Sequence, residues 1–489
     1  MLKRLIFNRF VLPLIAIMSL AVGAAGSGQV LAASTTKTLS TNFTLVNFGT
    51  STANVSVSYV KTDGSAWTAD SGNTNFTIPA NGGQKPVYQY FDGTLTAGQG
   101  SAVVSSDQPL GAVVQILARN GQVPTSGAYA AVPPASKLYA PLVLRHQGTA
   151  SGTANTQLVI QNAGTSSLSG ATVKFYNSTG SLVTTTNLPA IAAGASYYYD
   201  TEPDNTLGAP FAGSAVIDAG AGSISVVVNV FFGPDSLQTY PAIASTALTN
   251  SWAVPLFNSR LPNSLSTVVS VQNLSGAPVA ANAIFMDCTA FPGSAAPSTL
   301  HLNAPALNDG QSYSFNPVVN NSIPTAWYGA CRVSSPGNSA TIIQMRFVAG
   351  SNADAYDGIP TALTGKTFFT PLVQNRLSNG FATNTTIVNL SPSLTAHVTV
   401  TFTPSPDYVS GGGSAAVLST VTTIPGGSSL QENNRVPPFM VGATTMPTGW
   451  YGTLSVVSSD EPIAGFTQIT NINNPPGDTF MTFNAFTQP

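Results

Sequence analysis

The sequence predicts an all-β protein of four tandem β-sandwich domains that follow a signal peptide. Three observations predict this class. Short phrases recur four times along the 489 residues, apolar and polar residues alternate between them, and no long helical pattern is visible. The hydrophobic fraction is 43% although charged residues are only 7%, so the chain can build cores and charged-type disorder is excluded.

The N-terminal residues have the order of a secretory signal peptide. Three basic residues stand within the first nine positions, an apolar run extends from Val11 to Val22, and the small residues Ala32 and Ala33 follow. The alternative is a membrane anchor, but the run is shorter than the about 20 residues that a membrane-spanning helix needs. We expect cleavage near Ala33, a secreted, extracellular or cell-surface protein, and no membrane span in the mature chain.

Internal repeats are the strongest pattern. One phrase ends in an asparagine, at Asn47, Asn162, Asn273 and Asn389. A second begins with a glycine, at Gly100, Gly213, Gly329 and Gly452. A third runs from a proline to an arginine and occurs three times, at 141–145, 255–260 and 371–376. The mature length of 456 residues (489 minus 33) equals four repeats of 114, which leaves nothing for a separate catalytic domain.

These spacings place a signal peptide at residues 1–33. They place the four domains at residues 34–136, 137–250, 251–366 and 367–489. Alternating runs such as residues 397–402 predict strands with one buried face, and Gly, Pro, Asn and Asp mark the turns between strands. About seven short strands in roughly 100 residues is typical of an immunoglobulin-like sandwich. The short linkers between repeats predict a rod of stacked domains.

Further features carry a family resemblance. A Val-Ser-Ser-Asp-x-Pro turn stands at 104–109 and 457–462, and an aromatic residue closes each repeat at Tyr129, Tyr240, Tyr356 and Phe480. In these features the chain resembles the tandem Ig-like repeats of secreted bacterial cell-surface proteins. The resemblance covers the whole mature chain. It implies a non-catalytic cell-surface or extracellular protein and supplies no functional residues.

Cys288 and Cys331 are the two cysteines of the chain, and export favours a disulfide between them. Cys288 ends the alternating strand of the third repeat and Cys331 lies in the glycine phrase, so we expect them on neighbouring strands of one sheet. The alternatives are two buried free thiols or a metal site, which no nearby histidine supports. Because the other repeats lack cysteines, the bridge reinforces the architecture without being required for it.

The distribution of ionisable residues predicts no enzyme. The 18 acidic residues are dispersed, and His146, His301 and His397 lie in different repeats, so we expect no catalytic residues, no cofactor and no metal. A net charge of -2 with 16 Lys and Arg also excludes a nucleic-acid surface.

Two groups of side chains keep a binding interpretation open. The loop with Asn352, Asp354 and Asp357 has oxygens that could ligate calcium, although an ordinary Asx turn is favoured, and Asp63 with Asp70 is a weaker case. Aromatic residues follow a turn at equivalent places in three repeats: Tyr88, Tyr90 and Phe91; Tyr197, Tyr198 and Tyr199; Tyr313 and Phe315. Exposed rows of this kind can stack on sugar rings, but strand alternation would place every second ring in the core.

The first repeat lacks the third phrase, and its first strand is correspondingly short. Only 13 positions separate Ser34 from Asn47, against 21 from Pro141 to Asn162. Thr36–Leu39 could form a shortened strand. Alternatively, an open edge would accept a strand from a second copy, which predicts head-to-tail assembly. We therefore expect a structural or adhesive cell-surface protein, such as a self-assembling filament or layer subunit, with itself or other cell-surface components as partners. The alternative is a carbohydrate-binding extracellular protein.

Overall fold

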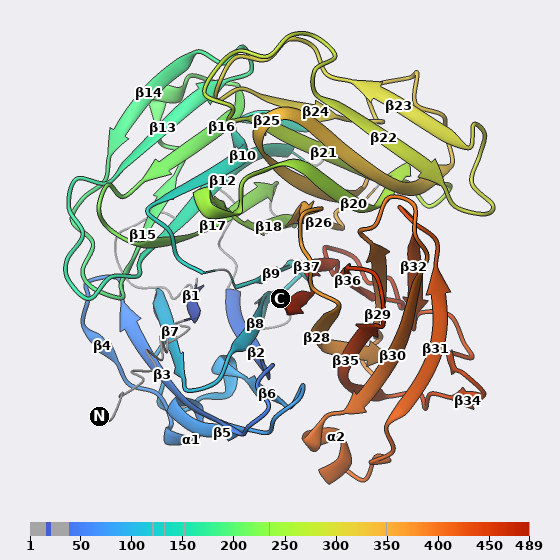
Figure 1. Cartoon of the computed structure of the whole chain (residues 1–489). Coiled ribbons are helices and arrows are strands. Elements are labelled where there is room, and N and C mark those ends of the chain that lie inside the picture. Colours follow the sequence, from blue (N-terminus) through green and yellow to red (C-terminus); the bar gives the residue numbers. More distant parts are fainter. Residues whose placement is uncertain are drawn as a thin grey trace, which may run out of the picture.

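The computed structural model describes residues 16–20, 39–119, 122–131, 133–149, 152–233, 235–348 and 350–488. Throughout these ranges the strands pair antiparallel, and the two α-helices, α1 (Ser71–Thr74) and α2 (Pro406–Ser410), are short. The sheets fall into four consecutive stretches of chain, residues 16–130, 137–244, 249–360 and 367–488. We call these stretches block one to block four (Figure 1).

Block two consists of two layers of strands. The outer layer has the order β14 (Leu182–Asn187), β13 (Thr172–Asn177), β16 (Phe211–Asp218), β10 (Lys137–Arg145) and β19 (Ile243–Ala244). The inner layer, nearer the centre of the molecule, has the order β11 (Gln147–Thr149), β12 (Gly152–Asn162), β17 (Ile224–Phe232) and β18 (Leu237–Pro241), with β15 (Ser196–Asp200) also on β12. Buried residues of both layers, such as Phe175 and Val228, form one apolar core. The alternation of buried and exposed side chains along these strands produces this core.

Blocks three and four repeat this arrangement. In block four the outer layer has the order β31 (Leu418–Ile424), β30 (Ala396–Pro404), β35 (Trp450–Ser458), β28 (Thr367–Asn375) and β38 (Phe486–Gln488). The inner layer has the order β32 (Ser429–Asn433), β29 (Phe381–Asn389), β36 (Ile463–Asn471) and β37 (Met481–Asn484). A separate pair is formed by β33 (Met440–Val441) and β34 (Thr444–Thr445). In block three the strands are β23 (Thr299–Asn303), β22 (Phe285–Ala290), β25 (Trp327–Phe347), β20 (Thr249–Ser259), β27 (Ile359–Pro360), β24 (Ser312–Phe315), β21 (Leu265–Asn273) and β26 (Ala353–Asp357). The 21-residue β25 takes part in both layers, so they form one eight-stranded sheet.

Block one differs in its first strand, and no described strand lies on the far side of that strand as β19 does in block two. Its outer layer is β1 (Ala16–Leu20), β7 (Gly100–Ser106), β3 (Ala53–Lys61) and β4 (Ala66–Trp67), with β5 (Asn75–Ile78) on β3, and its inner layer is β6 (Gln84–Val87), β2 (Leu39–Asn47), β8 (Leu110–Ala118) and β9 (Ser126–Ala130). The first strand, β1, lies in the expected signal peptide. The remaining expected features of that peptide, the basic start and Ala32 and Ala33, lie outside the described residues.

The prediction of an all-β, sandwich-like fold is confirmed. The strand order has a feature that the sequence did not indicate. In an immunoglobulin constant domain the first strand pairs with the second. Here the first strand of each of blocks two to four pairs with the strand of the glycine phrase, as β10 does with β16.

The repeated asparagines join the two layers of each block. The side chains of Asn47, Asn162, Asn273 and Asn389 are buried. In each, Nδ2 donates to a carbonyl oxygen in the following loop and to a second one 29 to 35 positions further on, at 2.7 to 3.1 Å, and Oδ1 accepts from the backbone N–H two residues on. The amide thereby adds a second hydrogen bond to buried carbonyl oxygens such as those of Ile191 and Leu307, which also accept from the backbone N–H groups of Leu168 and Val279.

The repeated glycines allow two strands to approach closely. A Cβ at Gly213 would lie 1.9 Å from the carbonyl oxygen of Tyr176 on β13, and a Cβ at Gly452 would lie 2.1 Å from that of Thr403 on β30. The ring of Trp450 lies 2.8 Å from the same Cβ position at Gly452. No side chain fits at these positions, so the glycine recurs for a steric reason.

The four blocks close into a circle, so the expectation of a rod is wrong (Figure 1). The last inner strands, β9, β18, β26 and β37, meet at the centre, where each contacts at least two of the others. Block four also contacts block one, because Phe48 stacks on Phe369 with ring centroids 5.4 Å apart and Gln488 Nε2 donates to the Phe48 carbonyl oxygen at 2.7 Å. Contacts between blocks cannot be deduced from linker length. A short linker limits how far two neighbouring blocks can move, but it does not set the direction in which the second block follows the first.

Candidate functional site

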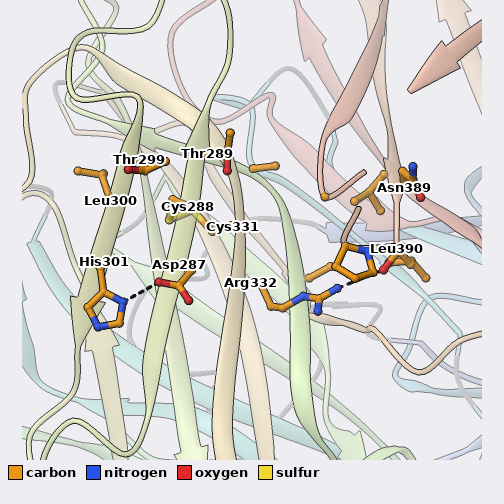
Figure 2. Close-up of a pocket in the computed structure, with 15 residues that line it drawn as sticks. Asp287, Cys288, Thr289, Thr299, Leu300, His301, Cys331, Arg332, Asn389 and Leu390 are labelled. Atoms are coloured by element: carbon orange, nitrogen blue, oxygen red, sulfur yellow. Dashed lines mark hydrogen bonds and ion pairs between the residues drawn. A yellow bond between two sulfur atoms is a disulfide. The ribbon is translucent and has the colours of Figure 1, made fainter. Parts of the chain in front are cut away.

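A pocket of about 400 Å³ lies between blocks three and four (Figure 2). Strands β22, β23 and β25 form one wall, and residues 388–392 with Gly427 form the other. Arg332 crosses the gap and its Nη2 donates to the Leu390 carbonyl oxygen at 3.1 Å. The guanidinium therefore joins the two blocks.

The predicted disulfide is confirmed at the base of this pocket. Cys288 on β22 and Cys331 on β25 lie directly opposite each other and form a bond of 2.02 Å. The alternatives of free thiols and a metal site are thereby excluded. In block two the same pair of positions holds Phe175 and Ala215, so the disulfide takes the place of an aromatic–small pair.

His301 beside the pocket is paired with a carboxylate. Its Nδ1 lies 2.6 Å from Asp287 Oδ1 across neighbouring strands, and this hydrogen bond raises the pKa of the exposed imidazole. The other side chain that shifts this pKa by hydrogen bonding is Asn303. The two cysteines nearby are bridged to each other. The arrangement is that of an exposed cross-strand ion pair.

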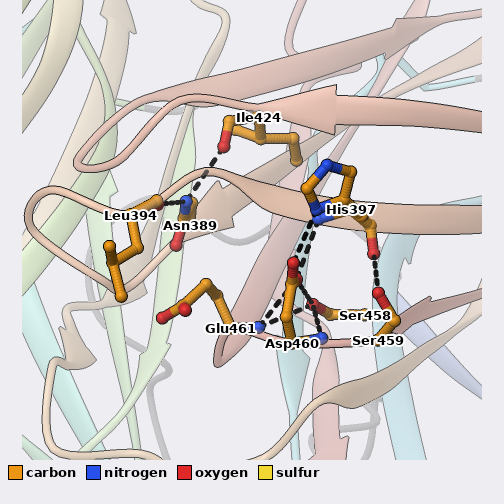
Figure 3. A network of polar contacts seen from close by, with 8 residues as sticks. All are labelled: Asn389, Leu394, His397, Ile424, Ser458, Ser459, Asp460 and Glu461. Carbon is orange, nitrogen blue, oxygen red and sulfur yellow. Dashed lines mark hydrogen bonds and ion pairs between the residues drawn. The ribbon is translucent and has the colours of Figure 1, made fainter.

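A second histidine, His397, belongs to a network of serine, histidine and aspartate side chains (Figure 3). Its Nδ1 lies 2.6 Å from Asp460 Oδ2. The hydroxyl of Ser458, however, donates to Asp460, and that of Ser459 donates to the backbone carbonyl of His397. A catalytic triad requires the hydroxyl to bond to the imidazole, so these bonds do not activate a nucleophile.

The same network has a structural counterpart in block one. Asp107 accepts from the backbone N–H of Asn54 at 2.8 Å and from its side chain, as Asp460 accepts from the backbone and side chain of His397. Both aspartates belong to the repeated Val-Ser-Ser-Asp-x-Pro turn. The contact therefore fixes the turn to the neighbouring strand in two blocks.

The acidic loop of block three does not have the geometry of a calcium site. Asn352 Oδ1 accepts from the Thr479 N–H at 2.7 Å, and the Asp357 carboxylate accepts from Asn484. Oxygens that accept from N–H donors are not directed at a cation. Asp63 likewise accepts from both the N–H and the hydroxyl of Ser65 in its turn. Within the described ranges no three His, Cys, Asp or Glu side chains are grouped to hold a metal ion.

Asp354 instead connects all four blocks at the centre of the molecule. Its carboxylate is fully buried on β26 of block three and accepts from the backbone N–H groups of Ala128, Thr239 and Thr482, which belong to blocks one, two and four. The three distances are 3.1, 2.8 and 2.6 Å. One side chain thus satisfies backbone donors from three neighbours.

Asp478 supports the same centre from block four. Its carboxylate accepts from the N–H groups of Leu237 and Ala353 at 3.0 and 3.2 Å. Burial raises the pKa of both Asp354 and Asp478 well above the usual range, while the backbone donors oppose that rise. We call these two carboxylates with β9, β18, β26 and β37 the central junction. Its hydrogen bonds favour a rigid four-block body.

The candidate sugar-binding aromatics are exposed together only in block one. Tyr88, Tyr90 and Phe91 are 46%, 42% and 72% exposed. In block two Tyr199 is buried and Tyr198 donates to the Gly100 carbonyl oxygen at 3.0 Å, a contact between blocks. The remaining members, Tyr197, Tyr313 and Phe315, are half-buried or buried. The described residues therefore do not form a row repeated in each block.

Charged groups accompany the exposed rings of block one. The Arg119 guanidinium lies over Tyr90 and Phe91, 4.6 and 5.9 Å from the ring centroids. Burial and the nearby Asp407 of block four raise the pKa of Tyr88. We call Tyr88, Tyr90, Phe91 and Arg119 the aromatic patch. Its rings could stack on a flat ligand while Arg119 and the tyrosine hydroxyls bond to it.

Comparisons with known proteins do not identify the chain. No family model and no curated protein matches it. Among solved structures, Escherichia coli alpha-2-macroglobulin activated by porcine elastase matches with 12% identity and a TM-score of 0.09, over 96% of this chain and 44% of that one. The chain thus spans less than half of that protein, and a score this low carries no inference. In the part of the chain that the structure describes, no helix is long and apolar enough to cross a membrane.

Proposed function

We propose that this chain is a secreted, non-catalytic structural or adhesive protein of the cell surface. In this proposal the four blocks are tandem domains of the broad immunoglobulin-like class, at residues 34–136, 137–250, 251–366 and 367–489. That class includes sandwiches whose strand order departs from the antibody one. The low charge and the expected signal peptide favour a subunit that assembles with itself or with other surface components.

The central junction is the observation that carries the proposal. Backbone donors from three blocks converge on Asp354, and further ones converge on Asp478. Two fully buried carboxylates therefore hold blocks together. The histidines with carboxylate partners, His301 and His397, serve strand contacts. Buried polar groups used for contacts between blocks and between strands suit a rigid structural subunit better than an enzyme.

A comparison of cells that produce the protein with cells from which its gene is deleted tests this proposal. We expect the protein in the medium or on the surface, where added protease degrades it in intact cells. We also expect deletion to remove a surface layer or filament in electron micrographs, or to reduce attachment of the cells. A chain found only inside cells would contradict the location. Unchanged surface structure and attachment after deletion would contradict the role.

A second candidate, glycan binding, is favoured by the aromatic patch alone. Exposed rings with an adjacent guanidinium are suited to stacking on a sugar and bonding to its hydroxyls. Retention of the purified protein on immobilised polysaccharides tests this function. We expect Phe91→Ala to abolish retention. The control is Val421→Ala, because Val421 is another strongly exposed apolar residue and lies in block four. Equal retention of both variants, or none by the unaltered protein, would exclude this candidate.

A further inference from the structure

The outer layers of the blocks share one structural position. In blocks two, three and four, the first strand lies beside the glycine-phrase strand, as β10 beside β16, β20 beside β25 and β28 beside β35. In block one the same place beside β7 is held by β1, residues 16–20, which belong to the expected signal peptide. A segment expected to be removed thus completes a layer.

At the glycine of its phrase, β1 pairs with β7 as the other first strands pair with theirs. Leu20 lies opposite Gly100 on β7, just as Val143 lies opposite Gly213 in block two. Both strands run antiparallel to the glycine-phrase strand, but β1 covers only residues 100–104, whereas β10 covers residues 211–218 and has a register shift between Ala140 and Val143 that β1 lacks. The position on β7 is therefore specific for a strand and for its alignment, because a shift by one residue would exchange the two faces.

Without β1, strand β7 would be an open edge of its sheet. Its other edge is paired with β3, and Ala102 and Val104 are buried with β1 in place. Without β1, the backbone N–H and C=O groups along the open edge would lose their partners and the apolar core would face water.

The expected mature chain leaves few residues before β2 that could replace β1. Strand β2 begins at Leu39 in the inner layer, so cleavage after Ala33 leaves five residues, 34 to 38, before it. In block two the first strand alone has nine residues, and a further hairpin strand, β11, precedes β12. Five residues are too few for a full strand and the return to the inner layer. Of the alternative shortened strand at Thr36–Leu39, Leu39 belongs to β2 and residues 36–38 lie outside the described ranges.

We propose that the edge of β7 is a strand-binding site whose resident occupant is residues 16–20 of this chain. The site takes an extended apolar segment that runs antiparallel to β7 by strand addition. In the precursor the leader fills the site and keeps block one from pairing with other chains. Removal of the leader opens the site to a strand of a second copy. The binding of a second copy rests on the proposed function, because it is a form of the self-assembly proposed there. The strand-binding site on β7 does not depend on that function.

Amide hydrogen exchange of the full-length chain tests the binding site. Met18→Pro removes a backbone N–H and distorts the strand, so we expect exchange along β7 to speed up by about tenfold or more. The matched control is Ala24→Pro, which places the same substitution in the leader outside β1 and leaves β7 protected. A synthetic peptide of residues 13–23 added to the Met18→Pro chain restores protection, and a scrambled peptide of the same composition does not.

The outcomes distinguish the strand-binding site on β7 from the proposed self-assembly. Equal exchange along β7 in the unaltered chain and both proline variants would overturn the strand site, even if the protein assembles. Loss of protection in Met18→Pro with rescue by the peptide would establish the site, even if light scattering finds no self-association. Because the peptide is added from outside, rescue also distinguishes an empty site from an unfolded block one.

Discussion

Glu432 lies on β32 of block four, where burial raises the pKa of its carboxyl to about 7. Burial also raises the pKa of Asp200 and of Asp357 to about 6. Unfolded carboxyls titrate near pH 4. Between about pH 4 and 7, the folded state therefore binds more protons than the unfolded state, so the free energy of unfolding falls as pH rises. We expect a lower urea midpoint at pH 8 than at pH 5.

The variant Glu432→Gln isolates one contribution to this dependence. It removes the titrating group, so the difference between the midpoints at pH 5 and pH 8 becomes smaller. Asp63→Asn is the control because hydrogen bonds to Ser65 lower the pKa of this exposed carboxyl, which places its titration below the window. A midpoint that is equal or higher at pH 8 in the unaltered protein would refute the assignment.

Asp354 provides the residue-scale prediction for the central junction. In Asp354→Asn, one carboxylate oxygen becomes an amide N–H₂, which cannot accept from backbone N–H groups such as those of Ala128 and Thr482. Unsatisfied buried donors cost about 1–3 kcal/mol each, so we expect Asp354→Asn to lower the free energy of unfolding. Urea unfolding at pH 5 measures the change. The exposed Asp309→Asn, which keeps an acceptor for Gly276, is expected to change stability little. Equal stability of both variants would contradict the role of Asp354.

The sequence predicted side chains that act within a repeat, and it missed those that act between repeats. Asn162 and Gly213 were found because each block needs the same local contact and the residue therefore recurs. Asp354 and Asp478 have no such signal, because their partners are backbone N–H groups of distant residues and any residue except proline supplies one. The loop of Asp354 was noticed only for its oxygens, which suggested an Asx turn or, as the less favoured interpretation, a calcium site. Their actual partners depend on how the blocks are placed.

At the scale of the strand, the close approach of β30 and β35 at Gly452 predicts that a larger residue there destabilises block four. Gly452→Ala would bring a methyl group 2.1 Å from the Thr403 carbonyl oxygen, so β30 and β35 must separate. Overpacking of this kind costs about 1–3 kcal/mol. Gly93→Ala is the matched control, because no atom lies within 4 Å of its Cβ position. Thermal unfolding of both variants measures the difference, and a Gly452→Ala protein as stable as the control would show that the close approach is not required.

The disulfide supports a second prediction at this scale. It closes a loop of 43 positions, and removal by Cys288→Ala with Cys331→Ala is expected to cost about 3–4 kcal/mol in the chain-entropy model. Cys288→Phe with Cys331→Ala instead installs the pair that Phe175 and Ala215 form in block two. We expect the second variant to recover part of the stability, because the ring fills the space between the layers. Denaturant unfolding compares the two, and a phenylalanine variant less stable than the alanine one would show that block three is not equivalent to block two.

At the scale of the whole molecule, the closed circle predicts a compact particle. A compact chain of 489 residues has a radius of gyration of about 23 Å, whereas four sandwiches in a rod would have about twice that value. Small-angle X-ray scattering at low concentration measures this radius. Asp478→Ala removes the acceptor for Leu237 and Ala353, so we expect partial opening and a larger radius. The control Asp309→Asn keeps the compact value. A rod-like radius for the unaltered protein would contradict the closure between blocks one and four, because the Phe48–Phe369 contact exists only if the two ends of the chain meet.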